Sequence, residues 1–168
     1  RRVLFRSQVI AQGEHKIGKI AAKVGLKNAN ITSFLNRLQD LDLIERRVPV
    51  FEARPDKSKK GLYFFTDHFF RFWFAFMFPY SGDIEMGLID FVRTRIEEGF
   101  GRFISPVFEE VCQETILKKR LFPVHRIGRH WERHLEIDVV ARGEADLFFG
   151  ECKWSDRPVG LDVLQQLK

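Results

Sequence analysis

Two short stretches near the end of the chain carry ionisable side chains at two-residue spacing. The first contains Glu136 and Asp138, and the second contains Glu151 and Lys153. Alternate residues of a β-strand project from the same face, so each pair would share one face if both stretches are strands. Pairing of the two strands in the appropriate register would bring Asp138 beside Glu151 and Lys153.

This group of side chains has the chemistry of a divalent-metal site. Asp138 and Glu151 follow apolar residues, and an unpaired anion buried among such neighbours would be costly. Carboxylate oxygens with open water positions suit Mg²⁺ (or Mn²⁺) better than zinc. Such an ion can activate a water and polarise a phosphodiester, while Lys153 stabilises the developing charge. The alternative interpretation is a buried salt-bridge cluster without chemistry.

The pattern around these residues predicts the elements that position them. Strands are expected over 124–129, 135–141 and 146–154, with a hairpin turn at 142–145. A helix is expected over 84–98, broken by Gly99 and Gly101 from a second helix near 105–119, which has Pro106 in its first turn and a cationic end. Helical spacing returns over 159–168.

The first part of the chain predicts a winged helix. Residues 17–24 have apolar side chains at helical spacing and end at Gly25, a left-handed cap. Asn28 is the expected N-cap of a second helix, whose apolar stripe is Ile31, Phe34, Leu35, Leu38 and Leu41. Strand-like residues 43–50 and 62–65 flank a basic tip over 55–61, which makes a wing.

Polar and basic side chains of this region are suited to DNA. The second helix turns short polar residues and one arginine outward, and the tip adds lysines that could neutralise phosphates. The candidate DNA-binding residues are Asn30, Thr32, Ser33, Asn36, Arg37, Lys57, Lys59 and Lys60. The alternative is a solvated face on a winged helix that only packs against a neighbouring domain.

Charge is divided unevenly along the chain. The 168 residues contain 28 basic and 23 acidic side chains, but residues 1–66 contain 14 and 6 of them. The remaining residues are mildly acidic. This division favours a first part of the chain that faces nucleic acid and a second part whose carboxylates have another role. Two cysteines cannot make a disulfide scaffold and suit a cytoplasmic protein. We expect no membrane segment and no signal peptide.

Residues 67–78 are rich in phenylalanine and form the expected link between the two parts. They are apolar on nearly every side, so a helix here should be buried all round, capped by Asp67 and ended by Pro79. We interpret it as a structural brace. A stacking platform for single-stranded nucleic acid is the alternative, but Arg71 is the only cation within the segment.

Two other motifs are excluded as sites. Residues 13–19 match GxxxxGK, but Ile20 replaces the hydroxyl residue that would hold Mg²⁺, so no nucleotide site is expected. His130 and His134 are four apart, but they precede a strand and lack the HExxH order of a zinc helix. His125 and Trp131 are expected to pack or to touch DNA.

The combination of Glu136-Ile137-Asp138 with Glu151-Cys152-Lys153, flanked by helices, resembles the PD-(D/E)xK nuclease superfamily. The order of motifs along the chain also resembles the C-terminal region of a family of archaeal and bacterial AAA+-type ATPases. These motifs include Arg71-Phe72-Trp73-Phe74 and the stretch from Glu151 that ends in Trp154. In that family a winged helix and a domain of unassigned function follow the ATPase module. The resemblance covers about residues 17–168.

The resemblance implies a fold and roles for particular residues. The expected fold is α+β or α/β, with a winged helix-turn-helix over 1–66, a helical connector over 67–100 and a restriction-endonuclease-like mixed-sheet core over 101–168, truncated at its C-terminus. Asp138 and Glu151 would be metal ligands, and Lys153 would stabilise charge or orient water. The acid on the preceding helix would be Glu109, with Glu110 as the fallback, and Gln165 is a weaker candidate for orienting the site.

Three functional hypotheses follow. The first is DNA binding with Mg²⁺-dependent hydrolysis of a phosphodiester, in a chain whose upstream part is an ATPase. The second is a DNA- or protein-binding regulatory module in which the nuclease-like fold is degenerate and non-catalytic. The third is a transcription regulator that acts through the winged helix alone. The sequence leaves the oligomeric state and the DNA structure preference open.

Overall fold

The computed structural model describes residues 2–160, 162 and 163, and shows a mixed α+β protein with two small antiparallel sheets. The chain forms two compact units. One contains Arg1–Arg47 and Gly61–Glu98, and the other contains Val48–Lys60 and Gly99–Lys168. The predicted α+β class is confirmed. The predicted domain ranges 1–66, 67–100 and 101–168 stay a prediction.

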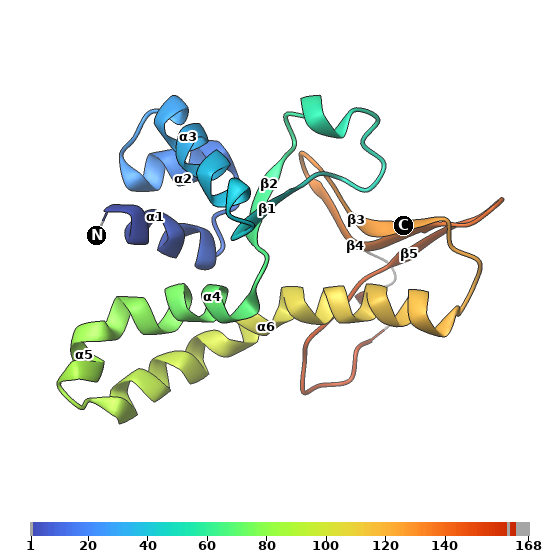
Figure 1. Cartoon of the computed structure of the whole chain (residues 1–168). Helices are drawn as coiled ribbons and strands as arrows, with labels where there is room; N and C mark the ends of the chain where they lie inside the picture. Colours follow the sequence, from blue (N-terminus) through green and yellow to red (C-terminus); the bar gives the residue numbers. More distant parts are fainter. Residues whose placement is uncertain (1, 161, 164–168) are drawn as a thin grey trace. The chain divides into compact units, whose positions relative to one another are not determined.

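The first unit begins with three helices and a two-stranded sheet (Figure 1). The helices are α1 (Arg2–Ala11), α2 (Ile17–Val24) and α3 (Asn28–Asp40), and the strands are β1 (Ile44–Arg47) and β2 (Leu62–Phe65). The strands pair antiparallel, with Ile44 opposite Phe65. α1 was not among the elements expected from the sequence pattern.

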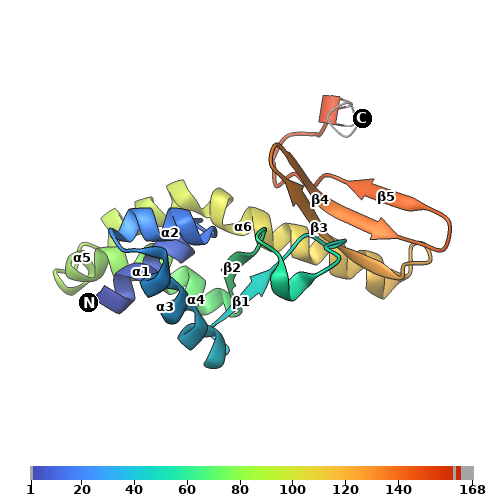
Figure 2. The same cartoon turned by 90° about the horizontal axis from the view of Figure 1, so that it is seen from above.

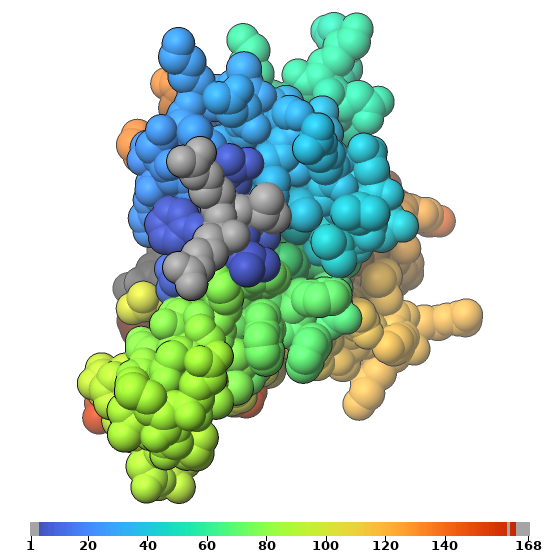
Figure 3. Space-filling view, turned by 60° about the vertical axis from the view of Figure 1, so that its left-hand side comes forward, coloured from blue at the N-terminus to red at the C-terminus, as the bar shows by residue number. Residues whose placement is uncertain are grey.

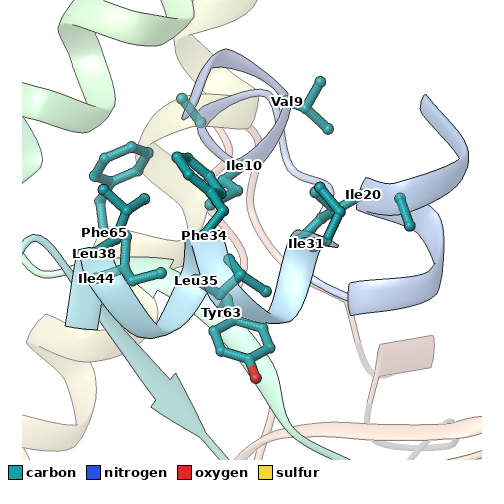
Figure 4. Close-up of a cluster of buried hydrophobic side chains, with 12 residues drawn as sticks. Val9, Ile10, Ile20, Ile31, Phe34, Leu35, Leu38, Ile44, Tyr63 and Phe65 are labelled. Carbon is teal, nitrogen blue, oxygen red and sulfur yellow. The ribbon is translucent and has the colours of Figure 1, made fainter. Parts of the chain in front are cut away.

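The core of this unit lies between the helices and β2 (Figure 4). Ile20 of α2 and Ile31 and Leu35 of α3 are fully buried. Ile10 of α1 and Tyr63 of β2 join them. The two predicted apolar stripes therefore form the core, with one exception. Leu41 is exposed, because α3 ends at Asp40 before its last predicted turn.

The turn between α2 and α3 depends on Gly25. This residue has a φ of 66°, and its N–H faces the carbonyls of Ala21 and Ala22, as the predicted cap requires. The N-cap prediction for Asn28 is wrong. Asn28 is the first residue of α3, and Lys27 holds the cap position without a side-chain hydrogen bond.

Replacement of Gly25 by alanine is expected to lower the free energy of unfolding by about 1 kcal/mol, because an L-residue is strained at positive φ. No atom lies within 4 Å of the added Cβ, so the backbone alone is responsible. Gly18→Ala is the matched control. It adds the same methyl group to open space inside α2, and should raise stability by about 0.5–1 kcal/mol. Urea denaturation measures both, and equal effects would contradict the prediction.

The phenylalanine-rich segment is less regular and less buried than its sequence predicts. It forms α4 (His68–Phe72), a π-helical turn η2 (Trp73–Met77) and a 3-10 turn η3 (Phe78–Tyr80). Asp67 caps α4 as predicted, since it accepts a hydrogen bond from the Phe69 N–H at 2.6 Å. The prediction of burial on all sides is wrong, because Phe69 is 64% and Trp73 41% exposed. Such short turns can bury one side only, and Phe74 packs on the core.

The region between residues 81 and 119 contains a short helix and one long helix. They are α5 (Ser81–Glu85) and α6 (Ile89–Lys119). The predicted break at Gly99 and Gly101 is wrong, and Pro106 lies inside α6 instead of in a first turn. A glycine costs a helix about 1 kcal/mol and a proline about 3 kcal/mol, which long-range packing can offset. The predicted cationic end is confirmed at Lys118 and Lys119.

The second unit contains a three-stranded sheet beside the last part of α6 (Figures 1 and 2). Its strands are β3 (Arg126–Glu132), β4 (Leu135–Arg142) and β5 (Leu147–Gly150), in the order β3-β4-β5. Every described strand pair is antiparallel, since hairpins connect the strands, so the expected mixed sheet is not seen among these residues. The predicted third strand ends early, and residues 151–154 continue as irregular chain.

The segment between β1 and β2 belongs to this second unit. It runs from Val48 to Lys60 and contains the 3-10 turn η1 (Pro55–Lys57). The predicted helix over 159–168 falls mostly outside the described residues, as does Gln165. None of the described helices is long and apolar enough to cross a membrane.

Candidate functional site

A bulge in β4 lies at Asp138. Gly128 of β3 faces Val140, but His130 faces Ile137, so β4 advances one residue more than β3 between these pairs. Asp138 and Val139 therefore oppose the single residue Arg129. Bulges re-aim side chains and are common beside active sites.

Asp138 is held by its neighbours on both sides. It is only 8% exposed. Its Oδ2 accepts a hydrogen bond from the Cys152 N–H at 2.9 Å, and its carbonyl accepts one from Gln113 Nε2 of α6 at 2.8 Å. Residues from α6 and from the chain after β5 thus bind Asp138 of β4, one through its backbone carbonyl and the other through its carboxylate.

Glu151 and Lys153 lie next to Asp138, as the predicted register required. The pairing of β4 with β5 ends at Val139 and Gly150, and the Cys152 N–H binds the Asp138 carboxylate just beyond this pair. Lys153 Nζ contacts Glu151 Oε1. This contact, together with the charges of Asp138 and Glu109, raises the pKa of Lys153, so its ammonium stays charged.

Glu109 is the buried acid that α6 contributes. It is 7% exposed, and its Oε2 lies 3.2 Å from Arg129 Nε. Neither of these two atoms has an aligned hydrogen-bond partner among the described residues. Burial raises the pKa of Glu109 to about 7. Arg129 opposes this effect, while Asp138, Glu136 and Glu151 add to it. Glu110, the fallback, is only partly buried.

Arg129 is a residue of this site that sequence reasoning missed. Its guanidinium contacts both Glu109 and Glu136. The signal available in the sequence was its place in the predicted first strand, next to the acidic second strand. That place alone does not say which carboxylates it reaches, because the bulge in β4 sets the pairing.

The structure thus brings together four of the predicted site residues, namely Glu109, Asp138, Glu151 and Lys153. The charges of Asp138 and Glu151 help to raise the pKa values of Glu109 and Lys153, so the four residues form one electrostatic cluster. We call these four residues the carboxylate cluster. Glu136 is exposed and joins it through Arg129.

The chemistry of the cluster fits a divalent cation, because its donors are hard carboxylate oxygens and Glu109 Oε2 is buried without an aligned hydrogen bond. The geometry is less complete. Within the described part of the chain, no group of three or more His, Cys, Asp or Glu side chains is arranged to hold a metal ion. This statement includes His130, which lies on β3, and His134, which lies in the following turn.

Comparison with known proteins identifies the family. The model of family DUF234, described as archaea bacterial proteins of unknown function, matches residues 73–163, more than half of the chain. The chain belongs to this family. The uncharacterized protein MJECL04 of Methanocaldococcus jannaschii is 35% identical over 156 residues, which cover 89% of this chain and 35% of that protein. The chain therefore spans about a third of the length of this relative. No solved structure matches significantly.

The region that matches DUF234 contains the whole carboxylate cluster and a pair of cysteines beside it. Cys112 and Cys152 are free thiols that line the same pocket of about 500 Å³, together with apolar side chains such as Phe108 and Phe148. Burial, followed by a hydrogen bond with Cys112, raises the pKa of Cys152 to about 12. This residue is therefore a neutral thiol at physiological pH, which does not suit a thiolate ligand.

The candidate DNA-binding residues of α3 lie outside the region matched by DUF234. Asn30, Thr32, Ser33, Asn36 and Arg37 are all exposed. α3 lies at the surface of the first unit (light blue in Figure 3). The Thr32 hydroxyl donates to the Asn28 carbonyl, a bond within the helix.

The lysines of the predicted wing tip differ in their surroundings. Lys57 and Lys59 are exposed. Lys60 Nζ lies 2.9 Å from Glu132 Oε1 and 4.0 Å from Glu52 Oε2. Trp131, expected to pack or to touch DNA, donates its indole N–H to the Lys60 carbonyl at 2.9 Å, whereas His125 is exposed.

Proposed function

We propose that this chain binds DNA and hydrolyses its phosphodiester bonds with Mg²⁺ (or Mn²⁺). In this proposal the first unit acts as a winged helix whose helix α3 contacts DNA. The second unit acts as a PD-(D/E)xK-type core, and both follow an ATPase module in a longer cytoplasmic protein. The convergence of Glu109, Asp138, Glu151 and Lys153 is the observation that supports catalysis most directly.

Each residue of the cluster has a distinct role in this proposal. Asp138 and Glu151 would hold the ion, which when bound polarises a phosphoryl oxygen and activates water. The Cys152 N–H keeps the Asp138 carboxylate aimed. The Lys153 ammonium stabilises the negative charge that develops on the phosphate. Glu109, with a pKa of about 7, is suited to accept a proton from the attacking water at neutral pH.

A second candidate function is a non-catalytic DNA- or protein-binding regulatory module with a degenerate nuclease fold. The observation in its favour is that, within the described residues, no three acidic, His or Cys side chains are arranged to hold a metal ion. In this version the ion pairs of Arg129 and Lys153 only stabilise the second unit.

Incubation with supercoiled and branched DNA distinguishes the two functions. Wild-type protein should nick or cut one of these substrates in Mg²⁺ or Mn²⁺ and should fail in EDTA. Asp138→Ala and Lys153→Ala variants, purified in parallel, control for a contaminating nuclease. Cleavage that never occurs, or that survives both substitutions, would contradict the catalytic function.

A further inference from the structure

The segment Val48–Lys60 is attached to β3 near both of its ends. The Val50 N–H donates to the Arg129 carbonyl at 2.9 Å, and the Trp131 indole N–H donates to the Lys60 carbonyl at 2.9 Å. The segment is therefore held against the strand that also carries Arg129. Figure 1 shows it beside β3, with η1 in teal.

Apolar packing reinforces this attachment. Val50 is buried with Ile137 and Val140 of β4, and Phe51 packs against the same group. Gly128 leaves room for it, since a Cβ there would lie only 3.1 Å from Val50 Cγ2. Hydrogen bonds alone would be a weak attachment for an exposed loop, whereas burial of these side chains fixes its position.

The acidic end of β3 secures the last residue of the segment. Glu132 pairs with Lys60, and this contact lowers the pKa of Glu132 and raises the pKa of Lys60. Lys60 therefore belongs to the attachment. The remaining cations of the segment, Arg54, Lys57 and Lys59, are exposed and line a shallow pocket of about 360 Å³.

Arg129 connects this basic segment to the carboxylate cluster. Its carbonyl accepts the bond from Val50, and its guanidinium contacts Glu109 and Glu136. Glu132, which holds Lys60, is three residues further along the same strand, or about 10 Å at the usual rise per residue. The exposed cations and the cluster thus belong to one unit, and both parts contact Arg129 of β3.

We propose that Val48–Lys60 is a phosphate-binding arm of the carboxylate cluster, and that its attachment to β3 is what makes it effective. Arg54, Lys57 and Lys59 would bind the backbone of the same DNA that the cluster cleaves, and Lys60 with Glu132 and Trp131 would hold them in place. This inference rests on the proposed function. In this inference the segment is no longer a free wing that assists α3. It is a part of the second unit, which carries the carboxylate cluster.

Two double variants test this arm by DNA binding in EDTA, which requires no cleavage. Lys57→Gln/Lys59→Gln removes two phosphate contacts and should weaken binding about tenfold, with a salt slope reduced by about 2. Trp131→Phe/Glu132→Gln breaks the attachment at Lys60 and removes one negative charge. If the segment acts as a free wing, this variant should bind DNA as well as wild-type protein or better. If the segment acts as an attached arm, the variant should bind about fivefold more weakly.

A matched control and a cleavage assay complete the experiment. Lys118→Gln/Lys119→Gln removes two charges from the end of α6 and should change affinity less than the arm variant, and thermal unfolding verifies that each variant is folded. Unchanged or tighter binding by Trp131→Phe/Glu132→Gln overturns the arm. Wild-type protein that binds DNA with these differences but never cleaves it overturns the proposed function and leaves the arm supported.

Discussion

Replacing Lys153 by methionine is expected to lower the rate of DNA cleavage by about 10²–10³-fold, because the developing phosphate charge then lacks its positioned donor. The Lys153 ammonium contacts Glu151 and stays charged, since the neighbouring carboxylates raise its pKa. Methionine is unbranched and one heavy atom shorter, and it lacks the ammonium group with its charge and hydrogen-bond donors. Single-turnover cleavage in saturating Mg²⁺ measures the loss directly.

Lys153→Arg is the informative control for this prediction. It keeps the positive charge but changes its shape, so it should retain more activity than Lys153→Met. DNA affinity in EDTA should change less in both variants than in Lys57→Gln/Lys59→Gln, because Lys153 is already paired with Glu151. Equal rates for Lys153→Met and wild-type protein would show that this lysine has only a structural role.

Local patterns predicted the parts of the fold that depend on periodicity. The apolar stripe of α2, with Ile20, and that of α3, with Ile31 and Leu35, lie in the core of the first unit. Gly25 takes the left-handed conformation that its place after α2 required. These features follow from residues a few positions apart, where helical geometry leaves few alternatives.

Other parts of the fold depart from what local propensity predicts. Gly99, Gly101 and Pro106 disfavour a helix locally, yet α6 continues through all three. The exposure of Phe69 and Trp73 likewise depends on which side of a short turn contacts the core. Propensity is a weak guide where tertiary contacts contribute more than the local cost.

The candidate site shows the same division. The two-residue spacing predicted only that each pair would share one strand face, and proximity of Asp138 to Glu151 required a particular register. The observed register ends at the pair of Val139 with Gly150, next to these two residues. The ion pair between Arg129 and Glu109 could not be predicted from the sequence, because it depends on the bulge in β4 and on the packing of α6 against the sheet. The attachment of Val48–Lys60 to β3 could not be predicted either, since the basic composition of the segment resembles that of any exposed wing.

The raised pKa of Glu109 leads to a prediction about protein stability that does not depend on catalysis. Burial raises its pKa from 4.5 to about 7 in the folded protein. Between these values the unfolded chain has lost the proton and the folded protein still holds it. The folded protein therefore binds more protons, and its stability must fall as the pH rises through this window.

The size of this effect follows from the difference between the two pKa values. Each unit corresponds to 1.36 kcal/mol, so the loss between pH 4.5 and pH 8 amounts to about 3 kcal/mol. Glu109→Gln lacks the titrating proton and should not show it. Relative to the protonated carboxyl, the amide adds an offset that does not change with pH.

Urea denaturation of wild-type protein and Glu109→Gln at several pH values between 4.5 and 8 separates the two contributions. The unfolding free energy of the variant minus that of wild type should rise by about 3 kcal/mol across this range. Glu144→Gln, which removes an exposed carboxyl from the β4–β5 turn, should give a difference that stays nearly constant. A constant difference for Glu109→Gln as well would mean that Arg129 keeps Glu109 ionised throughout, and that this carboxyl is not a proton acceptor poised near neutral pH.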